Sequence, residues 1–576
     1  MAFIGIDLGT TTSEASVYKN GKVEMIKNEY SEDITPSFVS LDSSLTLQFG
    51  RPAKQAYRDV AKEFKRRMGT SETTRLGNHE YNAIELSSLL LKYIKKYAEN
   101  FLGETVDRAV ITIPANFTES QRNATLRAGE LAGLKVERII HEPTAAALAF
   151  SETHKDLEGK VLVYDLGGGT FDITILDYSR QVVDVIVSEG DTHLGGIDFD
   201  IALYNHVLSR AKSEDGVTLD TGEVSEDNLK RKRRLELEME TAKINLSFQP
   251  HMEINIPYLA VLNGATYSLD KTVQRHSFEE LISTQIDKSF QCVEKALSMA
   301  KLTVTDIDYV LLVGGSSRIP LVREKVSAMF GQKKVLYNID PDRAVAIGAG
   351  IQAAIIDGVH TDNTIIMDVV PHSIGTDVVA SIDGNMIKGL FSEIIPANSP
   401  MQREFSDRFY TVVDDQQQIE VNVFQKASMN NSMFVHEMEQ LVPDNPDECL
   451  LSGIPPAPAG EQSVTITFSY NLNGTVDVKA KLDSTGKDIR FSAKRSYRSD
   501  TNANLVTQTW ENSEMARQVQ IVQELVNKRL QDIAPEQQLV LMGKLKLMQE
   551  AAVRNDSAAV NRLDDEINTY LFDISS

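Results

Sequence analysis

The first part of the chain alternates short apolar runs with longer stretches of helical period. Uninterrupted apolar runs such as 161–164 and 309–313 are typical of strands that helices bury on both faces. Helical spacing covers 85–101 and 119–132. The pattern predicts an α/β domain over residues 1–357.

From residue 371 to 497 the apolar positions follow a period of two. Alternation covers 419–423, 464–470 and 476–482. The pair Asn473-Gly474 between the last two runs is a strong hairpin signal. These features predict an antiparallel β-sandwich over 371–497.

The stretch between these two regions, 358–370, begins with a polar, glycine-containing run. It continues with Ile365, Ile366 and Met367. A purely flexible linker has no need of three large apolar side chains. We therefore expect a linker that can dock on the first domain.

The last part of the chain, 498–576, returns to helical spacing. Apolar residues recur every three or four positions from 515 to 530, and Pro535 and Ser557 are typical of helix starts. The pattern predicts a short helical lid. A small bundle that packs on itself fits it as well as a partner-binding surface does.

The net charge of the chain limits the kinds of partner that it can bind. The 59 basic and 82 acidic residues give a net charge of −23, which argues against nucleic acid and anionic membranes as main partners. No apolar run reaches the roughly 18 residues that cross a bilayer, and no signal-peptide pattern precedes the first strand, so we expect a cytoplasmic protein. Cys292 and Cys449 are too few for a zinc site, and we expect two reduced thiols.

A short motif occurs twice in the α/β region. Residues 4–11 and 163–170 each contain an apolar strand, an Asp, a glycine turn and a Thr. Such turns let backbone N–H groups approach phosphates, and Asp7 and Asp165 beside a phosphate require Mg²⁺ between them. One copy is also compatible with a plain tight turn, whereas two copies indicate a duplicated domain with a site between the halves.

A third glycine turn, 314–320, follows the apolar run 309–313. It is suited to an adenosine lying against the backbone, with Arg318 near the base or ribose; a sharp strand-to-helix turn is the structural alternative. These features alone also fit an actin-superfamily small-molecule kinase or filament protein. Neither class predicts an apolar linker followed by a β-sandwich, and the catalytic Asp of a kinase is not identifiable.

Four motifs occur together in the order and spacing of one family: Ile-Gly-Ile-Asp-Leu-Gly-Thr-Thr (4–11), Glu-Pro-Thr-Ala-Ala-Ala (142–147), Asp-Leu-Gly-Gly-Gly-Thr-Phe-Asp (165–172) and Val-Gly-Gly-Ser-Ser-Arg-Ile-Pro (313–320). Up to about residue 495 the chain closely resembles the heat-shock-seventy, or DnaK-type, chaperones. The stretch 64–77 looks most like the bacterial HscC-type branch.

The resemblance implies a duplicated α/β actin-like ATPase domain, an antiparallel β-sandwich and a short α-helical lid. It implies an ATP-dependent chaperone, in which ATP binding and slow hydrolysis control the binding and release of extended hydrophobic segments of unfolded proteins. A J-domain co-chaperone and a nucleotide-exchange factor are the implied partners, with no nucleic acid and no membrane.

The resemblance also assigns roles to single residues, with ATP or ADP, Mg²⁺ and K⁺ as cofactors. The residues that match nucleotide contacts are Gly9, Thr10, Thr11, Gly167, Gly168, Gly169, Thr170, Glu240, Lys243, Ser247, Gly314, Gly315, Ser316, Arg318 and Asp342. The residues that match metal or catalytic positions are Asp7, Asp165, Asp172, Glu142, Thr170 and Lys65.

Lys65 shows how the resemblance changes a local interpretation. From its neighbours alone, the stretch 62–67 predicts a solvated basic helix face, as does 230–234. The resemblance instead makes Lys65 the residue that orients the attacking water. We keep the solvated-face interpretation for 230–234.

Positions around the allosteric switch also match, with two departures. Pro114 and Arg122 match a proline switch and its arginine sensor, and Arg138 and Asp368 match further allosteric positions. Asn116 stands where the family usually has Tyr, and His141 replaces the Asn before Glu-Pro-Thr. Both departures lie near the switch, so we expect ATP binding to persist and the interdomain coupling to be the property they alter.

The resemblance places a peptide groove in the sandwich, at Thr376, Val378, Val379, Phe409, Val412, Ile419 and Val421. Plain core packing is the structural alternative for Ile419 and Val421. One buried Leu gains about 1.5–3 kcal/mol, whereas micromolar binding needs about 8 kcal/mol. We therefore expect flanking apolar contacts and backbone hydrogen bonds to an extended client.

Overall fold

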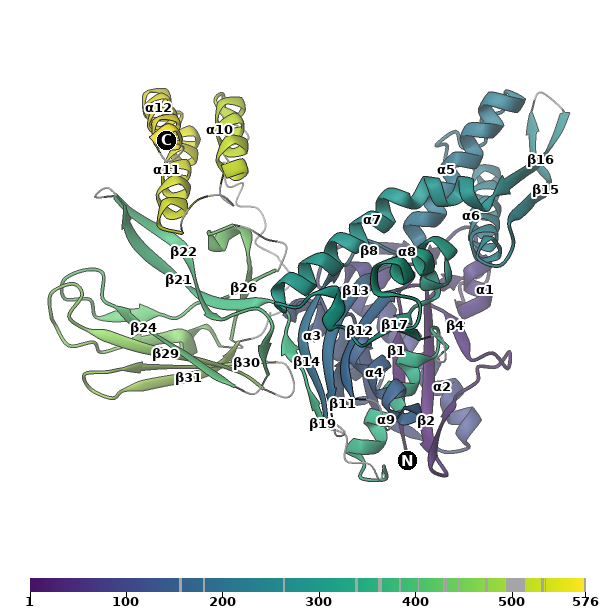
Figure 1. Ribbon diagram of the computed structural model, residues 1–576, viewed down its shortest axis with the longest axis horizontal. Coiled ribbons are helices and arrows are strands. Elements are labelled where there is room, and N and C mark those ends of the chain that lie inside the picture. The colour runs from purple at the N-terminus through teal and green to yellow at the C-terminus, as the bar shows by residue number, and fades with distance from the viewer. Residues whose placement is uncertain are drawn as a thin grey trace. The chain divides into compact units, whose positions relative to one another are not determined.

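The fold is taken from a computed structural model (Figure 1). It describes residues 1–154, 158–179, 182–262, 265–336, 340–360, 365–382, 385–401, 403–427, 430, 432–443, 445–471, 475–493, 513–529, 533 and 535–573. The described chain divides into two compact units. The first holds 1–372, 397–403 and 469–475, and the second holds 373–396, 404–468 and 476–576.

The first unit is built on two related six-stranded sheets. The strands of the first sheet are β1 (Ala2–Leu8), β2 (Thr12–Lys19), β3 (Lys22–Met25), β4 (Ile34–Pro36), β10 (Val106–Ile113) and β11 (Lys135–His141). Those of the second are β12 (Gly159–Leu166), β13 (Phe171–Ser179), β14 (Val182–Asp191), β17 (Tyr309–Val313), β18 (Val335–Leu336) and β19 (Ile365–Met367).

The two sheets share one pairing pattern. β1 pairs antiparallel with β2 and parallel with β10, and β12 pairs antiparallel with β13 and parallel with β17. The repeated sequence motifs therefore occupy equivalent positions, with Asp7 near the end of β1 and Asp165 near the end of β12. This confirms the duplicated α/β architecture that the repeat predicts.

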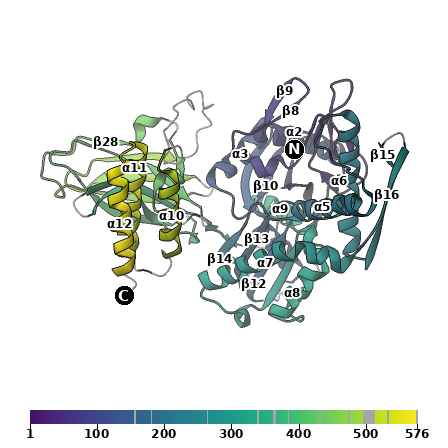
Figure 2. The ribbon, with the colours of Figure 1, turned by 90° about the horizontal axis from the view of Figure 1, so that it is seen from above.

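Helices pack against these sheets and against one another. α4 and α9 approach so closely that a Cβ on Gly348 would lie 1.8 Å from the carbonyl oxygen of Ala145. Figure 2 shows α5, α6, β15 and β16 gathered at one end of this unit. The helices, and the hairpin at that end, are α1 (Gly50–Gln55), α2 (Ala83–Leu102), α3 (Glu119–Leu131), α4 (Glu142–Thr153), α5 (Gly196–Asp215), α6 (Glu226–Leu246), α7 (Arg275–Met299), α8 (Pro320–Phe330), α9 (Ala344–Ile356), β15 (His251–Leu262) and β16 (Ala265–Gln274).

The predicted linker contributes a strand to the second sheet. β19 pairs in parallel with β14, in a register that sets Ile365 opposite Val182. Ile366 packs against the apolar core beside this sheet, whereas Met367 is 46% exposed.

The second unit contains antiparallel sheets, as the two-residue period predicts. Its main strands are β21 (Ser373–Ile382), β22 (Asn385–Ile395), β26 (Val423–Lys426), β27 (Glu439–Leu441), β24 (Glu404–Tyr410), β29 (Ser463–Tyr470), β30 (Val476–Leu482), β31 (Asp488–Ala493), β25 (Gln418–Glu420) and β28 (Leu450–Ser452). A short antiparallel pair, β20 (Val369–Val370) with β23 (Ser399–Pro400), belongs to the first unit. The predicted Asn473-Gly474 hairpin turn lies outside the described residues.

The alternation over 419–423 does not form one strand. β25 ends at Glu420 and pairs with β28, whereas β26 starts at Val423 and pairs with β21 and β27. Val421 and Val423 are both buried, so the alternation of burial persists while the hydrogen-bonding partner changes.

Three helices end the described chain: α10 (Ala516–Arg529), α11 (Pro535–Val553) and α12 (Ser557–Asp573). α11 and α12 run side by side in both views (Figures 1 and 2). Their apolar faces form one core that also includes Ile387, Leu390 and Phe434 of the second unit. No helix in the described part of the chain is long and apolar enough to cross a membrane.

Candidate functional site

The two repeated glycine turns meet inside the first unit. A Cβ on Gly168 would lie 2.2 Å from Thr11 Oγ1, and one on Gly169 would lie 2.5 Å from Thr10 Cγ2. Only glycine permits this approach of one turn to the other. The two halves therefore present their threonines and backbone amides to the same space.

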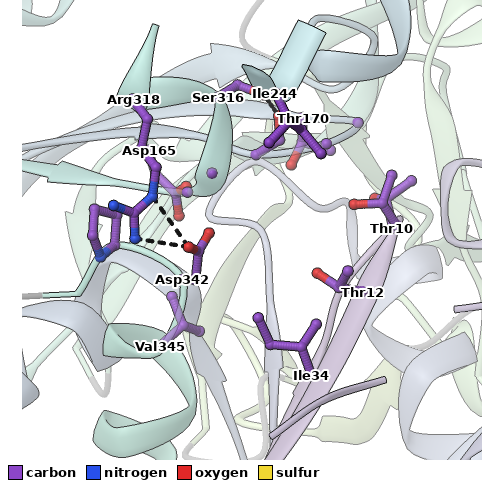
Figure 3. Close-up of a pocket in the computed structure, with 18 of the residues that line it drawn as sticks. Thr10, Thr12, Ile34, Asp165, Thr170, Ile244, Ser316, Arg318, Asp342 and Val345 are labelled. Atoms are coloured by element: carbon purple, nitrogen blue, oxygen red, sulfur yellow. Dashed lines mark hydrogen bonds and ion pairs between the residues drawn. The ribbon is translucent and has the colours of Figure 1, made fainter. Parts of the chain in front are cut away.

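A cavity of about 460 Å³ opens at this place (Figure 3). Every residue predicted to contact the nucleotide lines it: Gly9, Thr10, Thr11, Gly167, Gly168, Gly169, Thr170, Glu240, Lys243, Ser247, Gly314, Gly315, Ser316, Arg318 and Asp342. Asp7, Asp165, Lys65 and Glu142 line it as well.

Further lining residues were missed from the sequence: Thr12, Ile34, Asp200, Ile244, Phe248, Ile319, Pro341 and Val345. Two of them follow from helical spacing. Ile244 and Phe248 lie four and eight positions after Glu240, at the spacing of one helical face, although α6 itself ends at Leu246. The remaining apolar ones carry no chemical signal in the sequence.

Polar contacts fix the side of the cavity formed by α6 and the third glycine turn. Lys243 Nζ lies 2.8 Å from Asp200 Oδ2, and Ser316 Oγ donates to the Gly167 carbonyl at 2.9 Å. Arg318 pairs with Asp342 at 2.8 Å, as the dashed lines in Figure 3 mark. Gly314 has a φ of +77°, which glycine adopts readily.

Acidic groups surround the buried ammonium of Lys65 in the cavity lining. Lys65 is 3% exposed, and its Nζ lies 2.5 Å from Glu142 Oε1. The solvated face predicted from the charge pattern around Lys65 is therefore wrong. The sequence neighbours did not reveal its partner, because Glu142 lies 77 positions away.

The carboxyl groups near Lys65 are destabilised in their charged forms. Burial, and next the charge of Glu142, raise the pKa of Asp7 to about 7 and that of Asp172 to about 8. The same causes raise the pKa of Asp165 well above its usual range. One ammonium does not neutralise these groups, and oxygen donors of this kind suit Mg²⁺ or K⁺.

Direct coordination by the side chains alone is not available here. Within the described ranges, no group of three or more His, Cys, Asp or Glu side chains is placed to hold a metal ion. A cation at Asp7 and Asp165 would therefore share its shell with water and phosphate oxygens, which is the habit of Mg²⁺.

Asp172 does not belong to the cavity lining. It is buried, and its Oδ1 accepts hydrogen bonds from the backbone N–H and the side-chain amide of Asn116. Asp172 nevertheless lies opposite Asp165 in the β12–β13 register, directly beside the lining.

Among the predicted allosteric residues, Arg138 lies near both Arg122 and Asp368. Pro114 is buried directly after β10, and Arg122 is buried on α3. Asp368 is also buried, and the His141 imidazole lies 2.9 Å from it. Burial lowers the pKa of Arg138, while the Asp368 carboxylate opposes that shift.

The basic run 230–234 is not a uniformly solvated face. Arg233 is buried, bonds to the Lys54 carbonyl and pairs with Glu236 at 2.7 Å. Arg234 donates to the Pro257 and Tyr258 carbonyls. The solvated-face prediction fails because carbonyls distant in sequence bind these guanidinium groups.

The predicted groove residues lie on several strands of the second unit. Thr376, Val378 and Val379 lie on β21, and Phe409 lies on β24. The other three are Val412 after β24, Ile419 on β25 and Val421 directly after it. Thr376 and Val421 are buried, whereas Val412 is exposed.

A duplicated α/β unit with three glycine turns around one cavity is the architecture of an actin-like ATPase. Comparison with known proteins is more specific, because the family model "Hsp70 protein" matches residues 3–75 and 70–573. The chain belongs to the Hsp70 family of ATP-dependent chaperones, which hydrolyse ATP and bind unfolded polypeptides.

Individual relatives carry the same description. The chain is 38% identical to "Chaperone protein DnaK" of Thermotoga neapolitana over 84% of this chain and 79% of that protein. It is 35% identical to the protein of that name from Thermotoga petrophila over 99% of this chain and 94% of that protein. With the Thermosipho melanesiensis protein of the same name, it shares 38% identity over 84% of this chain and 79% of that protein.

Proposed function

We propose that ATP binds with its phosphates between the turns at 9–11 and 167–170 and its adenosine between α6 and the turn at 314–318. The observation that supports this is the shared lining. Segments far apart in sequence contribute glycines, threonines and an Arg–Asp pair to a single cavity. These are the residue types that phosphate and adenosine recognition require.

Lys65 orients the attacking water in this proposal, with Thr170, Glu142 and Asp172 as the other catalytic groups. In-line attack on a γ-phosphate needs positioning and positive charge more than a strong base. A buried ammonium meets this need, and its pairing with Glu142 holds it in place.

Asp7, Asp165 and Asp172 are the proposed residues for Mg²⁺ and K⁺. Burial raises the pKa values of these groups, and a bound cation would favour the charged carboxylates that burial disfavours. When bound, Mg²⁺ supplies neutralisation of the phosphate charge that develops during transfer. Asp172 is not part of the cavity lining, so in this proposal the orientation of its carboxylate decides how it interacts with the cation.

The coupling of ATP hydrolysis to peptide release completes the proposal. We assign residues 1–357 to the ATPase domain, 358–370 to the linker, 371–497 to the peptide-binding sandwich and 498–576 to the lid. The groove is assigned to β21 and the stretch 409–421. Within the family, the stretch 64–77 favours the HscC-type branch, and a J-domain co-chaperone and an exchange factor are the proposed partners.

Lys65→Ala tests the catalytic assignment. Removing one electrostatic contributor to a transition state costs about 10²–10³ in rate, so single-turnover hydrolysis should fall by that order. ATP affinity should change little, because the phosphate contacts are spread over the glycine turns. Lys92→Ala, an exposed lysine on α2, is the matched control. Normal hydrolysis by Lys65→Ala would remove Lys65 from the mechanism.

A further inference from the structure

Both positions at which the sequence departs from the Hsp70 pattern contact one short segment, 368–372. His141 Nδ1 lies 2.9 Å from Asp368 Oδ2, and His372 Nε2 lies 3.0 Å from the backbone oxygen of Asn116. These four residues are at most 8% exposed. The two departures are therefore not scattered surface changes. Each makes a buried contact with the segment 368–372, His141 with Asp368 and Asn116 with His372.

Asn116 has a second set of contacts on the side of the nucleotide site. Its Nδ2 donates to Asp172 Oδ1 at 3.1 Å, and its backbone N–H approaches the same atom at 3.3 Å. Gly190 packs against this amide, since a Cβ there would lie 2.5 Å from Asn116 Nδ2. One residue therefore joins His372 to Asp172.

The hydrogen bonds from His372 to Asn116 and from Asn116 to Asp172 form a relay, and the protonation of its histidine at neutral pH follows from burial. Burial lowers the pKa of His372 to about 4, so its ring is neutral, and its Nε2–H donates to the Asn116 carbonyl. Holding that carbonyl fixes the peptide plane that follows Asn116. The amide of Asn116 then orients Asp172 without cancelling its negative charge, which leaves the carboxylate available to a cation.

We propose that Asn116 is a positioning residue for ATP hydrolysis, which holds Asp172 in its working orientation when residues 368–372 are docked. This inference rests on the proposed role of Asp172. It makes His372 the group through which docking of that segment is sensed, and Asn116 the group that transmits it. Both act on the rate of hydrolysis and leave ATP binding to the glycine turns.

Single-turnover hydrolysis by the full-length protein tests the relay, with ATP affinity measured beside it. Loss of one such hydrogen bond corresponds to about 3- to 10-fold in rate, so Asn116→Ala and His372→Ala should each slow hydrolysis by that amount. ATP affinity should stay within about twofold, because neither side chain lines the cavity. His372→Gln, whose amide can still donate to the carbonyl, should retain most of the rate.

The double variant distinguishes a relay from two separate structural effects. In the Asn116→Ala background the side-chain amide is gone and only the backbone N–H of residue 116 still bonds to Asp172, so His372→Ala should cause a smaller further loss than it causes in the parent. His360→Ala is the matched control, because His360 Nε2 lies 2.7 Å from Glu152 and its buried ring has no part in the Asn116 contacts. It should hydrolyse ATP at the parent rate.

Several results would overturn the inference. An unchanged rate in Asn116→Ala, or additive losses in the double variant, would each do so. If Asn116→Ala does not fold, judged by loss of ATP binding, equal rates for His372→Ala and His372→Gln would overturn it instead. A parent protein that binds ATP without hydrolysing it would contradict the catalytic proposal, which is a separate outcome.

Discussion

At the scale of single residues, Glu14 is a buried carboxyl group whose charge is only weakly opposed, by the more distant Arg343. It is 2% exposed, and within the described part of the chain its Oε2 has no hydrogen-bond partner. It lies opposite Asp7 in the β1–β2 register, as Asp172 lies opposite Asp165 in the other half. Burial, and next the charge of Asp7, raise the pKa of Glu14 to about 10.

This shift predicts a stability that falls as pH rises. Between the unfolded pKa of about 4.5 and the folded pKa of about 10, the folded state binds more protons than the unfolded state. Glu14→Gln removes this dependence, so it should stabilise the protein by on the order of 2 kcal/mol at pH 7.5, and by less at pH 5.

Urea denaturation without nucleotide or Mg²⁺ measures this effect at both pH values. Glu72→Gln, at an exposed position, is the control and should show no such difference. A stability gain in Glu14→Gln that is equal at pH 5 and pH 7.5 would mean that Glu14 is ionised in the folded protein.

The residue types of the site were largely accessible from the sequence, whereas their partners were not. Glycines, threonines and Asp7 carry a chemical signature at fixed spacing, so the phosphate side of the lining could be predicted from the residues. Glu240, Lys243, Ser247 and Asp342 came only from the resemblance to the family. Local charge alone predicts a solvated face for both Lys65 and Arg233, because their partners Glu142 and the Lys54 carbonyl come from distant segments. The resemblance corrected this for Lys65 and not for Arg233. Long-range contacts of this kind leave no local pattern.

At the scale of elements, ion pairs join α6 to the segment 51–62 beside the cavity. Lys54 Nζ lies 2.7 Å from Glu240, which also lines the cavity, and Lys62 Nζ lies 3.2 Å from Glu236. Nucleotide release that separates these elements has to break both pairs. Their side chains are partly exposed, so salt weakens them.

Lys54→Ala should therefore release nucleotide faster. A pair of this kind contributes about 0.2–1 kcal/mol, which corresponds to about 1.5- to 5-fold in the dissociation rate. Stopped-flow dissociation of a fluorescent ADP at low and high salt measures it, and the gain should shrink at high salt. Lys22→Ala, whose pair with Glu24 lies on β3, is the control. An unchanged rate at low salt would show that the pairs do not hold the cavity closed.

The linker strand gives a second prediction at this scale. Because β19 extends the sheet at β14, a chain that ends at residue 370 should hydrolyse ATP faster than one that ends at 357. Ile366→Asp in the longer chain places a charge against the apolar core and should return the rate to that of the shorter chain. Equal steady-state rates for two folded chains would exclude the strand from the mechanism.

The boundaries of elements were predictable where local signals set them. α2 begins after Asn82, whose side chain and Glu85 form a capping box, and it ends before Gly103 at a φ of +73°. The break between β25 and β26 was not predictable, because it arises from a change of partner strand. Alternation of apolar residues predicts burial, but it does not specify which strand lies alongside.

At the scale of the whole molecule, one chain of the Hsp70 family combines ATP hydrolysis with the binding of unfolded polypeptides. The helices α10–α12 share a core with the second unit through Ile387, Leu390 and Phe434. α10 has 14 residues, about 21 Å of helix, and for so short a lid helix we predict fast peptide release even with ADP bound. A chaperone differs from an ATPase alone because the bound nucleotide changes the affinity for the peptide.

Peptide affinity measured with ADP and with ATP tests this claim most directly. A fluorescent, extended apolar peptide should bind the full-length protein more tightly with ADP, and ATP should speed its release about tenfold or more, a change of about 1.4 kcal/mol in coupling. Lys65→Ala should still release the peptide on ATP binding, because release follows binding rather than hydrolysis. Equal peptide affinity and equal release rates with ADP and ATP would contradict the account.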